Sequence, residues 1–237
     1  QEDVAKMFSA YDFFALPVVN GGGRLVGVIT VDDIIDVIEE EDTEDIHKIG
    51  GSRPLDDPYM SSSVTTVFRK RIGWLLVLFL AELLTGNILK TYESVLSQVV
   101  TLTFFIPLLT DTGGNSGSQA STLVIRAMAL GEVSIQDFAK IIWKEIQVGA
   151  ILGLAMGTVG FAFSWLMGGS MGIALTVAIT LVAVLVVSST VGAALPLIGG
   201  KLGLDPAVFS APLITTVVDA TGLLIYFRVA CRLLKIG

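Results

Sequence analysis

The sequence predicts a mainly helical membrane protein, in which a bundle of five membrane-spanning helices follows a small α/β module and a connecting helix. Three observations lead to this fold class. Of the 237 residues, 53% are hydrophobic and only 16% are charged, whereas a soluble domain carries more charge. The charge is divided unevenly, because residues 1–71 hold fourteen carboxylates and seven basic side chains, and the remaining residues hold eight of each. The second part also contains five long apolar segments.

The composition excludes several classes of protein. The apolar content is too high for intrinsic disorder, and a net charge of −7 without a basic stripe argues against nucleic-acid binding. A lone cysteine, Cys231, cannot form an intrachain disulfide, and a lone histidine, His47, cannot supply a His-based zinc site. No Ser/His/Asp set or metalloprotease motif indicates an enzyme. Because the sequence opens on Gln1 and an acidic stretch, we expect a piece of a longer protein.

Residues 1–41 are predicted to form the α/β module. The apolar run Ala15–Val19 is followed by a glycine-rich turn and by the alternating segment Arg24–Thr30, which together are typical of two strands. In Val31–Glu41 the apolar residues recur at helical spacing. The order is therefore strand, turn, strand, helix, and residues 42–71 are predicted to form a connecting helix and linker.

A run of carboxylates lies where the module meets the connecting helix. Glu39–Asp45 holds six acidic residues in seven positions. Such a run is often only a solvated helix face. Because like charges within two or three turns repel one another, a divalent cation or a basic partner surface would stabilise this run. The alternative interpretation is therefore a weak divalent-cation sensor.

The five apolar segments are each close to the roughly 20 residues that a membrane span needs. They cover residues 72–89, 92–112, 141–167, 172–198 and 208–234. A cytoplasmic N-terminus would place seven Lys and Arg residues on the inner side and four on the outer side, as the positive-inside rule prefers. We therefore expect a multi-pass protein of the cell (inner) membrane whose N-terminal part is cytoplasmic.

The third span carries glycines at every fourth position, namely Gly149, Gly153 and Gly157. Small residues at this spacing let helix backbones approach closely in lipid. We predict a helix-packing face here and infer nothing about a substrate from it.

Three carboxylates fall inside predicted spans, where an ionisable side chain is costly and normally faces a cavity or a partner. They are Glu82, Asp111 and Asp219, and no Lys or Arg lies mid-span to pair with them. Asp219 has Thr215 four residues before it and Gly222 three residues after it, so a carboxylate and a hydroxyl share a helix face. Oxygen ligands of this kind suit Mg²⁺ or Ca²⁺. The alternative is a protonated Asp219 bonded to a neighbouring helix.

A second polar face is predicted if the helix continues through the glycines after residue 112. It would carry Asp111, Asn115, Ser118, Gln119 and Thr122, and at membrane depth it must meet water or another helix. A phosphate-binding loop is rejected, because the Walker lysine is missing and no strand precedes the glycines. Glu82 is equally compatible with lining a pathway and with bonding to a neighbouring helix.

Three segments resemble parts of one known family. Pro107–Glu132, PLLTDTGGNSGSQASTLVIRAMALGE, resembles the signature of the MgtE family of magnesium channels. Ala15–Asp33 resembles the closing half of a CBS domain, as found before the membrane part of that family. Thr43–Lys48 resembles the start of its connecting, or plug, helix.

The resemblance implies a homodimer with five spans per subunit and a pore between the second and fifth helices. It implies that Asp219 binds hydrated Mg²⁺ in the pore, beside the pore-lining candidates Asp111, Asn115, Gln119, Thr215, Gly222 and Glu82. It further implies metal-binding carboxylates at the cytosolic mouth, namely Asp205, and in a sensor through which cytosolic Mg²⁺ closes the channel, namely Glu2, Asp12, Asp33, Asp36, Glu41, Glu44 and Asp45. Some members bind ATP at a complete CBS pair, of which this sequence holds one half, and the matching positions are Phe13, Thr30 and Asp33.

The expected function is therefore import of Mg²⁺ through a Mg²⁺-selective channel or transporter. Membrane potential would drive entry without ATP, at about 2.3 kcal/mol per charge per 100 mV. Two alternatives stay open. One is a divalent-cation exchanger coupled to Na⁺ or H⁺, and the other is a membrane receptor whose acidic cytosolic domain docks a basic partner.

Overall fold

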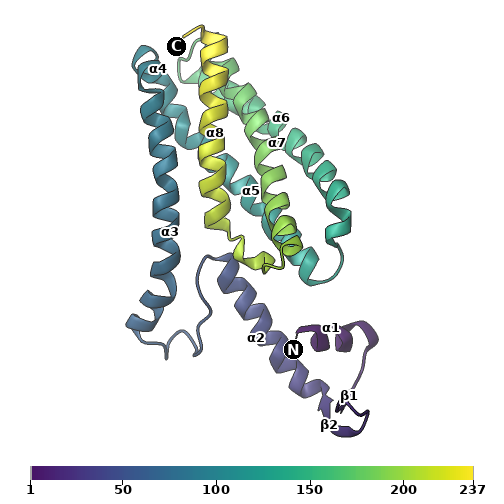
Figure 1. Cartoon of the computed structure of the whole chain (residues 1–237). Helices are drawn as coiled ribbons and strands as arrows, with labels where there is room; N and C mark the ends of the chain where they lie inside the picture. Colours follow the sequence, from purple (N-terminus) through teal and green to yellow (C-terminus); the bar gives the residue numbers. More distant parts are fainter. Residues whose placement is uncertain (1, 237) are drawn as a thin grey trace.

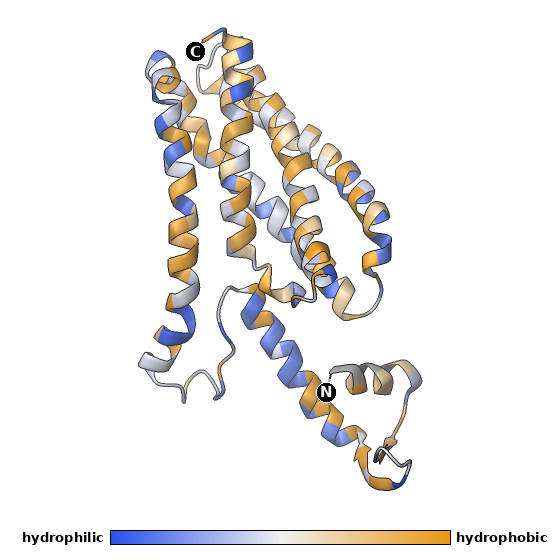
Figure 2. Cartoon of the chain, in the orientation of Figure 1, coloured by the Kyte–Doolittle hydropathy of each residue, from blue (hydrophilic) through white to orange (hydrophobic). Residues whose placement is uncertain are grey.

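The computed structural model describes residues 2–236, except for the side chains of residues 2, 3, 6 and 9. A small N-terminal module lies at one end of a long helical bundle, and the C-terminus lies at the opposite end (Figure 1). Figure 2 shows that helix α2 (Val31–Ile49) of the module is largely hydrophilic, whereas the bundle helices carry long hydrophobic stretches. The fold is mainly helical, as the sequence predicts.

The module has the predicted strand–turn–strand–helix order, preceded by a helix that the sequence analysis did not predict. The strands pair antiparallel, with Ala15 opposite Thr30, and Phe8, Ile34 and Ala5 form a small core. Its elements are α1 (Glu2–Tyr11), β1 (Ala15–Val19), β2 (Leu25–Thr30) and α2 (Val31–Ile49).

Helix α2 is continuous across residue 41, where we expected the module to end and the connecting helix to begin. Thr30 and Asp33 cap its first turn, because the Asp33 carboxylate accepts hydrogen bonds from the Thr30 backbone nitrogen (3.1 Å) and hydroxyl (2.8 Å). No glycine or proline interrupts the helix before Gly50. The acidic run therefore lies within a rigid rod that extends from the module to the bundle.

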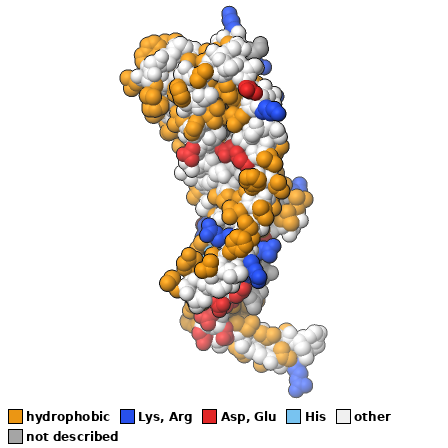
Figure 3. All heavy atoms as spheres, turned by 90° about the vertical axis from the view of Figure 1, so that its left-hand side faces the viewer, with side chains coloured by type: hydrophobic (Ala, Val, Ile, Leu, Met, Phe, Trp, Pro, Cys, Tyr) orange, Lys and Arg blue, Asp and Glu red, His pale blue; other side chains and the backbone are white. Residues whose placement is uncertain are grey.

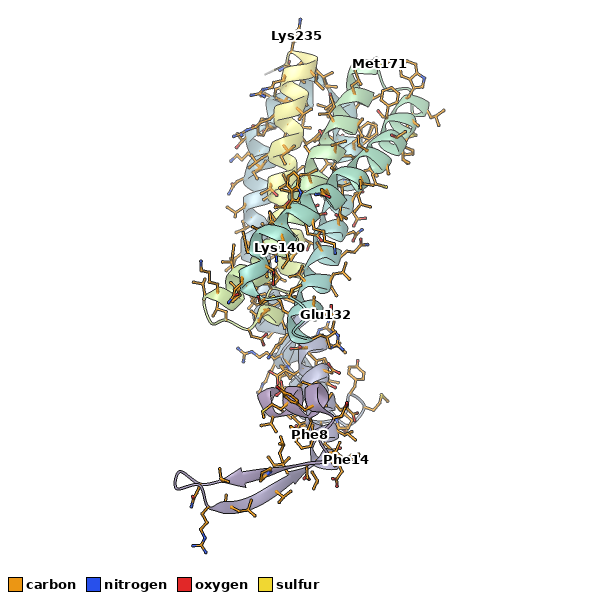
Figure 4. The ribbon with its side chains drawn as sticks, turned by 90° about the vertical axis from the view of Figure 1, so that its right-hand side faces the viewer. Phe8, Phe14, Glu132, Lys140, Met171 and Lys235 are labelled. Atoms are coloured by element: carbon orange, nitrogen blue, oxygen red, sulfur yellow. The ribbon has the colours of Figure 1, made fainter. Side chains whose placement is uncertain are left out.

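Four helical segments in the described part of the chain are long and apolar enough to cross a membrane, namely α3 (Val64–Thr91), residues 135–166, α7 (Met171–Lys201) and α8 (Ala211–Leu234). Glu132 and Lys140 lie toward the end of the bundle nearest Phe8 and Phe14 of the module, and Met171 and Lys235 lie at the far end (Figure 4). The elements are α3 (Val64–Thr91), α4 (Glu93–Gln98), η1 (Val100–Phe105), α5 (Ile106–Ala129), η2 (Ile135–Asp137), α6 (Phe138–Leu166), α7 (Met171–Lys201), η3 (Pro206–Val208) and α8 (Ala211–Leu234).

The predicted second span at 92–112 is not one continuous helix. Residues 93–105 form the short α4 and η1, and α5 begins at Ile106 with Pro107 in its first turn. Proline lacks the N–H that would continue a preceding helix and is well suited to start a new one. The Tyr226 hydroxyl donates to the Leu102 carbonyl (2.9 Å) and so binds one of the carbonyls within this irregular segment.

Helix α5 continues through its glycines to Ala129, because those glycines pack against other helices. A Cβ on Gly117 would lie 2.8 Å from Ile214 Cγ2, and one on Gly114 would lie 3.0 Å from Thr215 Cγ2. The glycine-rich segment thus brings α5 unusually close to α8.

The predicted glycine face of the third span is confirmed. A Cβ on Gly149 or Gly153 would lie 2.8 Å from backbone atoms of α7, at Leu185 and Val182 respectively. Helices α6 and α7 therefore pack backbone to backbone.

Candidate ion-binding site

A cavity of about 560 Å³ opens between α5 and α8, within the membrane part. Asp111 and Asn115 of α5 and Thr215 and Asp219 of α8 supply its polar lining, and Gly114 forms part of its wall. The sequence places these groups on two helices, and the glycines of α5 bring the helices together. The structure thus joins the two polar faces, which the residue patterns predicted separately and the resemblance placed along one pore.

The polar groups of the cavity present oxygen atoms. The Asn115 amide donates to the Asp111 carboxylate at 3.4 Å, which leaves its own carbonyl oxygen available. The Thr215 hydroxyl donates to the Pro212 carbonyl (2.9 Å), so its oxygen lone pairs remain acceptors. Carboxylate, amide and hydroxyl oxygens are the ligands that hard divalent cations prefer.

Glu82 of α3 belongs to the same acidic neighbourhood. Glu82 and Asp111 both interact electrostatically with the half-buried Asp219. Within the described residues, none of the three carboxylates forms an ion pair with Lys or Arg. Figure 3 shows carboxylates at mid-height among hydrophobic side chains, apart from the acidic cluster lower on the molecule. Three carboxylates without a basic partner at this depth favour the binding of a cation.

Three of the six predicted pore-lining residues do not line the cavity. Glu82 is exposed on α3, and Gln119 and Gly222 lie elsewhere. Gln119 lines a separate groove of about 540 Å³, which α5, α6 and α7 border. Gly222 is buried, and a Cβ built on it would lie 3.7 Å from the Val184 side chain of α7. Helical geometry explains both positions. Gly222 is three residues after Asp219, and Gln119 is eight residues after Asp111. Each is therefore rotated about its helix axis by up to a quarter turn, which is enough to meet a different neighbour.

At the module end of the bundle, a second cavity of about 730 Å³ separates α1 and α2 from the ends of the membrane helices. Its lining includes the carboxylates Glu41, Asp42, Asp45 and Asp205 and the basic groups Lys48 and Arg126. We call this space the acidic chamber. It contains three of the residues predicted to sense Mg²⁺, namely Glu41, Asp45 and Asp205.

Two of the predicted sensor carboxylates contact a lysine that the sequence analysis did not single out. Lys48 binds Glu44 and, at 2.6 Å, Asp205. Burial opposes the charged form of Lys48, but the hydrogen bonds with Asp205 and Glu44 outweigh it and raise the pKa of the ammonium group well above its ordinary value. A lysine four residues after a glutamate, at the end of an acidic helix, was the available sequence signal.

The other predicted sensor and nucleotide residues are dispersed over the module. Asp36 is exposed on α2, and Asp12 follows α1 with φ of 53°. Asp33 caps α2 together with Thr30, and the Phe13 ring stacks on Tyr11 at 5.4 Å between centroids. The Glu2 side chain lies outside the described residues. No group of three or more His, Cys, Asp or Glu side chains in the described residues is close enough to hold a metal ion.

The junction between the linker, α3 and α8 was also not predicted. The indole nitrogen of Trp74 donates to the Ser210 hydroxyl (3.0 Å), which lies immediately before α8. Gly51 follows α2 with φ of +74°, and a Cβ there would lie 2.8 Å from Trp74 Cδ1. Only glycine accommodates both that dihedral and that contact.

Two family profiles match parts of the chain. The family profile described as "Divalent cation transporter", MgtE, matches residues 106–229, and the CBS domain profile matches residues 1–40. The chain is similar to "Magnesium transporter MgtE" of Thermus thermophilus, with 43% identity over 99% of this chain and 52% of the relative.

Proteins with the same name in Bacillus subtilis and Enterococcus faecalis are 36% and 33% identical, over 97% and 99% of this chain and 51% of each relative. The chain therefore spans about half the length of the curated relatives it matches. The family is one of membrane transporters and not of enzymes. The family profile covers α5 and most of α8, the two helices that form the cavity, and the chain belongs to the MgtE family of divalent cation transporters.

Proposed function

We propose that the chain forms the membrane pathway of a Mg²⁺ transporter, that it acts as a channel for Mg²⁺ entry, and that its N-terminal module is cytoplasmic. The observation that carries the proposal is the cavity in which Asp219, Asp111, Asn115 and Thr215 meet without a basic partner among the described residues. The names of the similar proteins support Mg²⁺ as the ion.

The chemistry of the cavity suits a hydrated ion. Mg²⁺ gives up its water reluctantly, so a few carboxylates that bind it through water can attract it without trapping it. One chain supplies two lining carboxylates, with Glu82 nearby. An inward-negative potential of 100 mV would stabilise entry of a divalent ion by roughly 4–5 kcal/mol, since each charge contributes about 2.3 kcal/mol.

We propose a homodimer as the conducting form. Helix α3 stands at the edge of the bundle beside α8 (Figure 1), and only 11% of its most apolar window is buried. A second copy that covers this face would bring a second Asp219 toward the same pathway. Gating by cytosolic Mg²⁺ at the acidic chamber, and ATP binding by a complete CBS pair that includes Phe13, Thr30 and Asp33, belong to the same proposal.

The test is ion flux into proteoliposomes at fixed voltage, with Mg²⁺ or Ca²⁺ outside. We expect a Mg²⁺ current that falls at least tenfold in Asp219→Asn, because loss of a carboxylate charge that attracts the hydrated ion would raise the barrier to its passage by more than about 1.4 kcal/mol. Glu93→Gln, at an exposed carboxylate on α4, is the matched control and should conduct normally.

The same recordings separate the alternatives. A voltage-insensitive, electroneutral flux that requires Na⁺ or H⁺ would replace the channel by an exchanger. If the folded wild-type protein carried no flux and instead bound a basic partner in a salt-dependent manner, the receptor interpretation would replace transport.

A further inference from the structure

We propose that the groove between α5, α6 and α7 binds a phospholipid whose headgroup joins a phosphate to a primary ammonium, that is, a phosphatidylethanolamine. This is the groove of about 540 Å³ that Gln119 lines, and we call it the lateral groove. It is separate from the acidic cavity, because the two have no described lining residue in common. Its volume lies within the range of ligand sites, about 300–1,000 Å³.

The charged side chains of the lateral groove gather at its module-facing end, where Figure 4 shows Glu132 and Lys140. Lys140 and Lys144 are both exposed and lie four residues apart, so they share one face of α6. Lys140 already binds Asp137 at 3.0 Å. Within the described part of the chain, Lys144, Glu132 and Glu145 form no ion pair. The groove therefore presents both signs of charge without a direct partner.

Toward the middle of the membrane, the lining of the groove becomes apolar and open. Leu123 of α5 is 69% exposed, and Val148 and Leu152 of α6 are each 38% exposed. The deepest polar groups, Ser116 and Ser189, bond to each other at 2.9 Å and so have little left for a polar ligand. From the lysines to Leu152, α6 rises roughly 12–18 Å. An acyl chain can lie along this length while its headgroup stays among the charges.

The two signs of charge select the headgroup. Lys144, with Lys140 beside it, would attract the phosphate of any phospholipid. Glu132 and Glu145 would repel a purely anionic headgroup, whereas a primary ammonium would donate charge-assisted hydrogen bonds to them. A choline headgroup has no N–H to donate. A second copy of the chain suits the groove less well, because α3, the face proposed for assembly, contributes no described residue to its lining.

Lipid retention can be measured by native mass spectrometry of the full chain in mild detergent. Phosphatidylethanolamine, phosphatidylcholine and phosphatidylglycerol with identical acyl chains are added in equal amounts. We expect adducts of the first to exceed those of each other lipid by roughly two- to fivefold, as one partly exposed ion pair would give. The double variant Glu132→Gln, Glu145→Gln should remove this preference. Lys144→Met should lower retention of all three lipids, since each carries a phosphate.

Matched controls make the same changes outside the lateral groove. Glu93→Gln removes an exposed carboxylate of α4, and Lys201→Met removes an exposed lysine at the end of α7. Both should retain phosphatidylethanolamine as the wild type does. Equal retention of the three lipids by the wild type, or a preference that survives the double variant, would overturn the proposal.

Fluorescence quenching locates the acyl chain, because bromine on the chain quenches a tryptophan that it contacts. Leu123→Trp places an indole in the lateral groove, and quenching of the same chain without this change is subtracted. Brominated phosphatidylethanolamine should quench the added tryptophan more strongly than brominated phosphatidylcholine does. Leu83→Trp, at an exposed position of α3 outside the groove, should respond equally to both lipids. Equal quenching of Leu123→Trp by both lipids would overturn the proposal.

The competing occupant gives a different result. If no phospholipid is retained, and Leu123→Arg dissociates a dimer in micelles, the groove contacts a second copy and the lipid site is refuted. None of these measurements depends on ion flux, so a failure of the proposed transport function would leave the lipid result standing.

Discussion

At the scale of single residues, the chain uses few polar side chains in its membrane part, and the structure gives most of them a definite partner. Trp74 is one example, because its indole reaches across from α3 to the fully buried Ser210 hydroxyl. Without that donor, the Ser210 hydroxyl would lose its contact with α3. The bond therefore helps to position the start of α8, eight residues or so before Asp219.

Trp74→Phe keeps a large ring but removes the indole N–H. We expect a loss of about 1 kcal/mol of stability, the usual value of one hydrogen bond, measured as a lower Tm in micelles. Ser210→Ala should cost a similar amount, and the double variant should cost little more than either single variant. Trp143→Phe, on an exposed position of α6, is the control. Fully additive losses would show that the two residues do not interact.

At the scale of helices, close packing depends on glycine. The tightest contact with backbone atoms joins α5 and α7, where a Cβ on Gly192 would overlap the Gly117 carbonyl oxygen. Because that oxygen belongs to the backbone, no side-chain rotation can relieve the overlap, and the two helices must separate. Since α5 also forms a wall of the acidic cavity, its position relative to α7 sets the shape of the site.

Gly192→Ala is therefore expected to destabilise the protein by roughly 1–3 kcal/mol or more, as overpacking of a core does. Gly86→Ala is the matched control, because Gly86 also lies within a helix and a Cβ there meets nothing within 4 Å. The control should be neutral or slightly stabilising, since alanine favours helix by about 1 kcal/mol over glycine. Equal Tm values for the two variants would contradict the packing argument.

At the scale of the whole molecule, the open cavity and the exposed α3 favour assembly. If two copies meet with their Asp219 residues facing one pathway, cysteines at that position should come within reach of a short cross-linker. We expect Asp219→Cys, in a Cys231→Ala background, to yield a species of twice the 25.1 kDa chain mass on treatment with Hg²⁺.

The control for cross-linking is Thr158→Cys, at an exposed position on α6, away from the cavity. It should remain monomeric on a denaturing gel. Cross-linking of the control alone, or of neither variant in a protein shown to be dimeric in micelles, would place the interface on another face.

Much of this organisation followed from the sequence alone. Composition, charge division and apolar length were enough to predict a mainly helical membrane protein, and the spacing of Gly149, Gly153 and Gly157 predicted a packing face. The cost of a charge in lipid was enough to single out Glu82, Asp111 and Asp219. These properties are local or additive along the chain, so no knowledge of the neighbours was needed.

The tertiary structure decided which groups meet. It broke the predicted segment 92–112 before Pro107, placed Gln119 and Gly222 outside the cavity, and brought Lys48 to Asp205, 157 residues further along the chain. Such pairings depend on helix rotation and on the packing of glycine-bearing surfaces, which no single segment encodes. Residue patterns alone therefore determined that the membrane part would hold uncompensated carboxylates, whereas the meeting of two of them in one cavity, which the family resemblance implied, depends physically on the packing of α5 against α8.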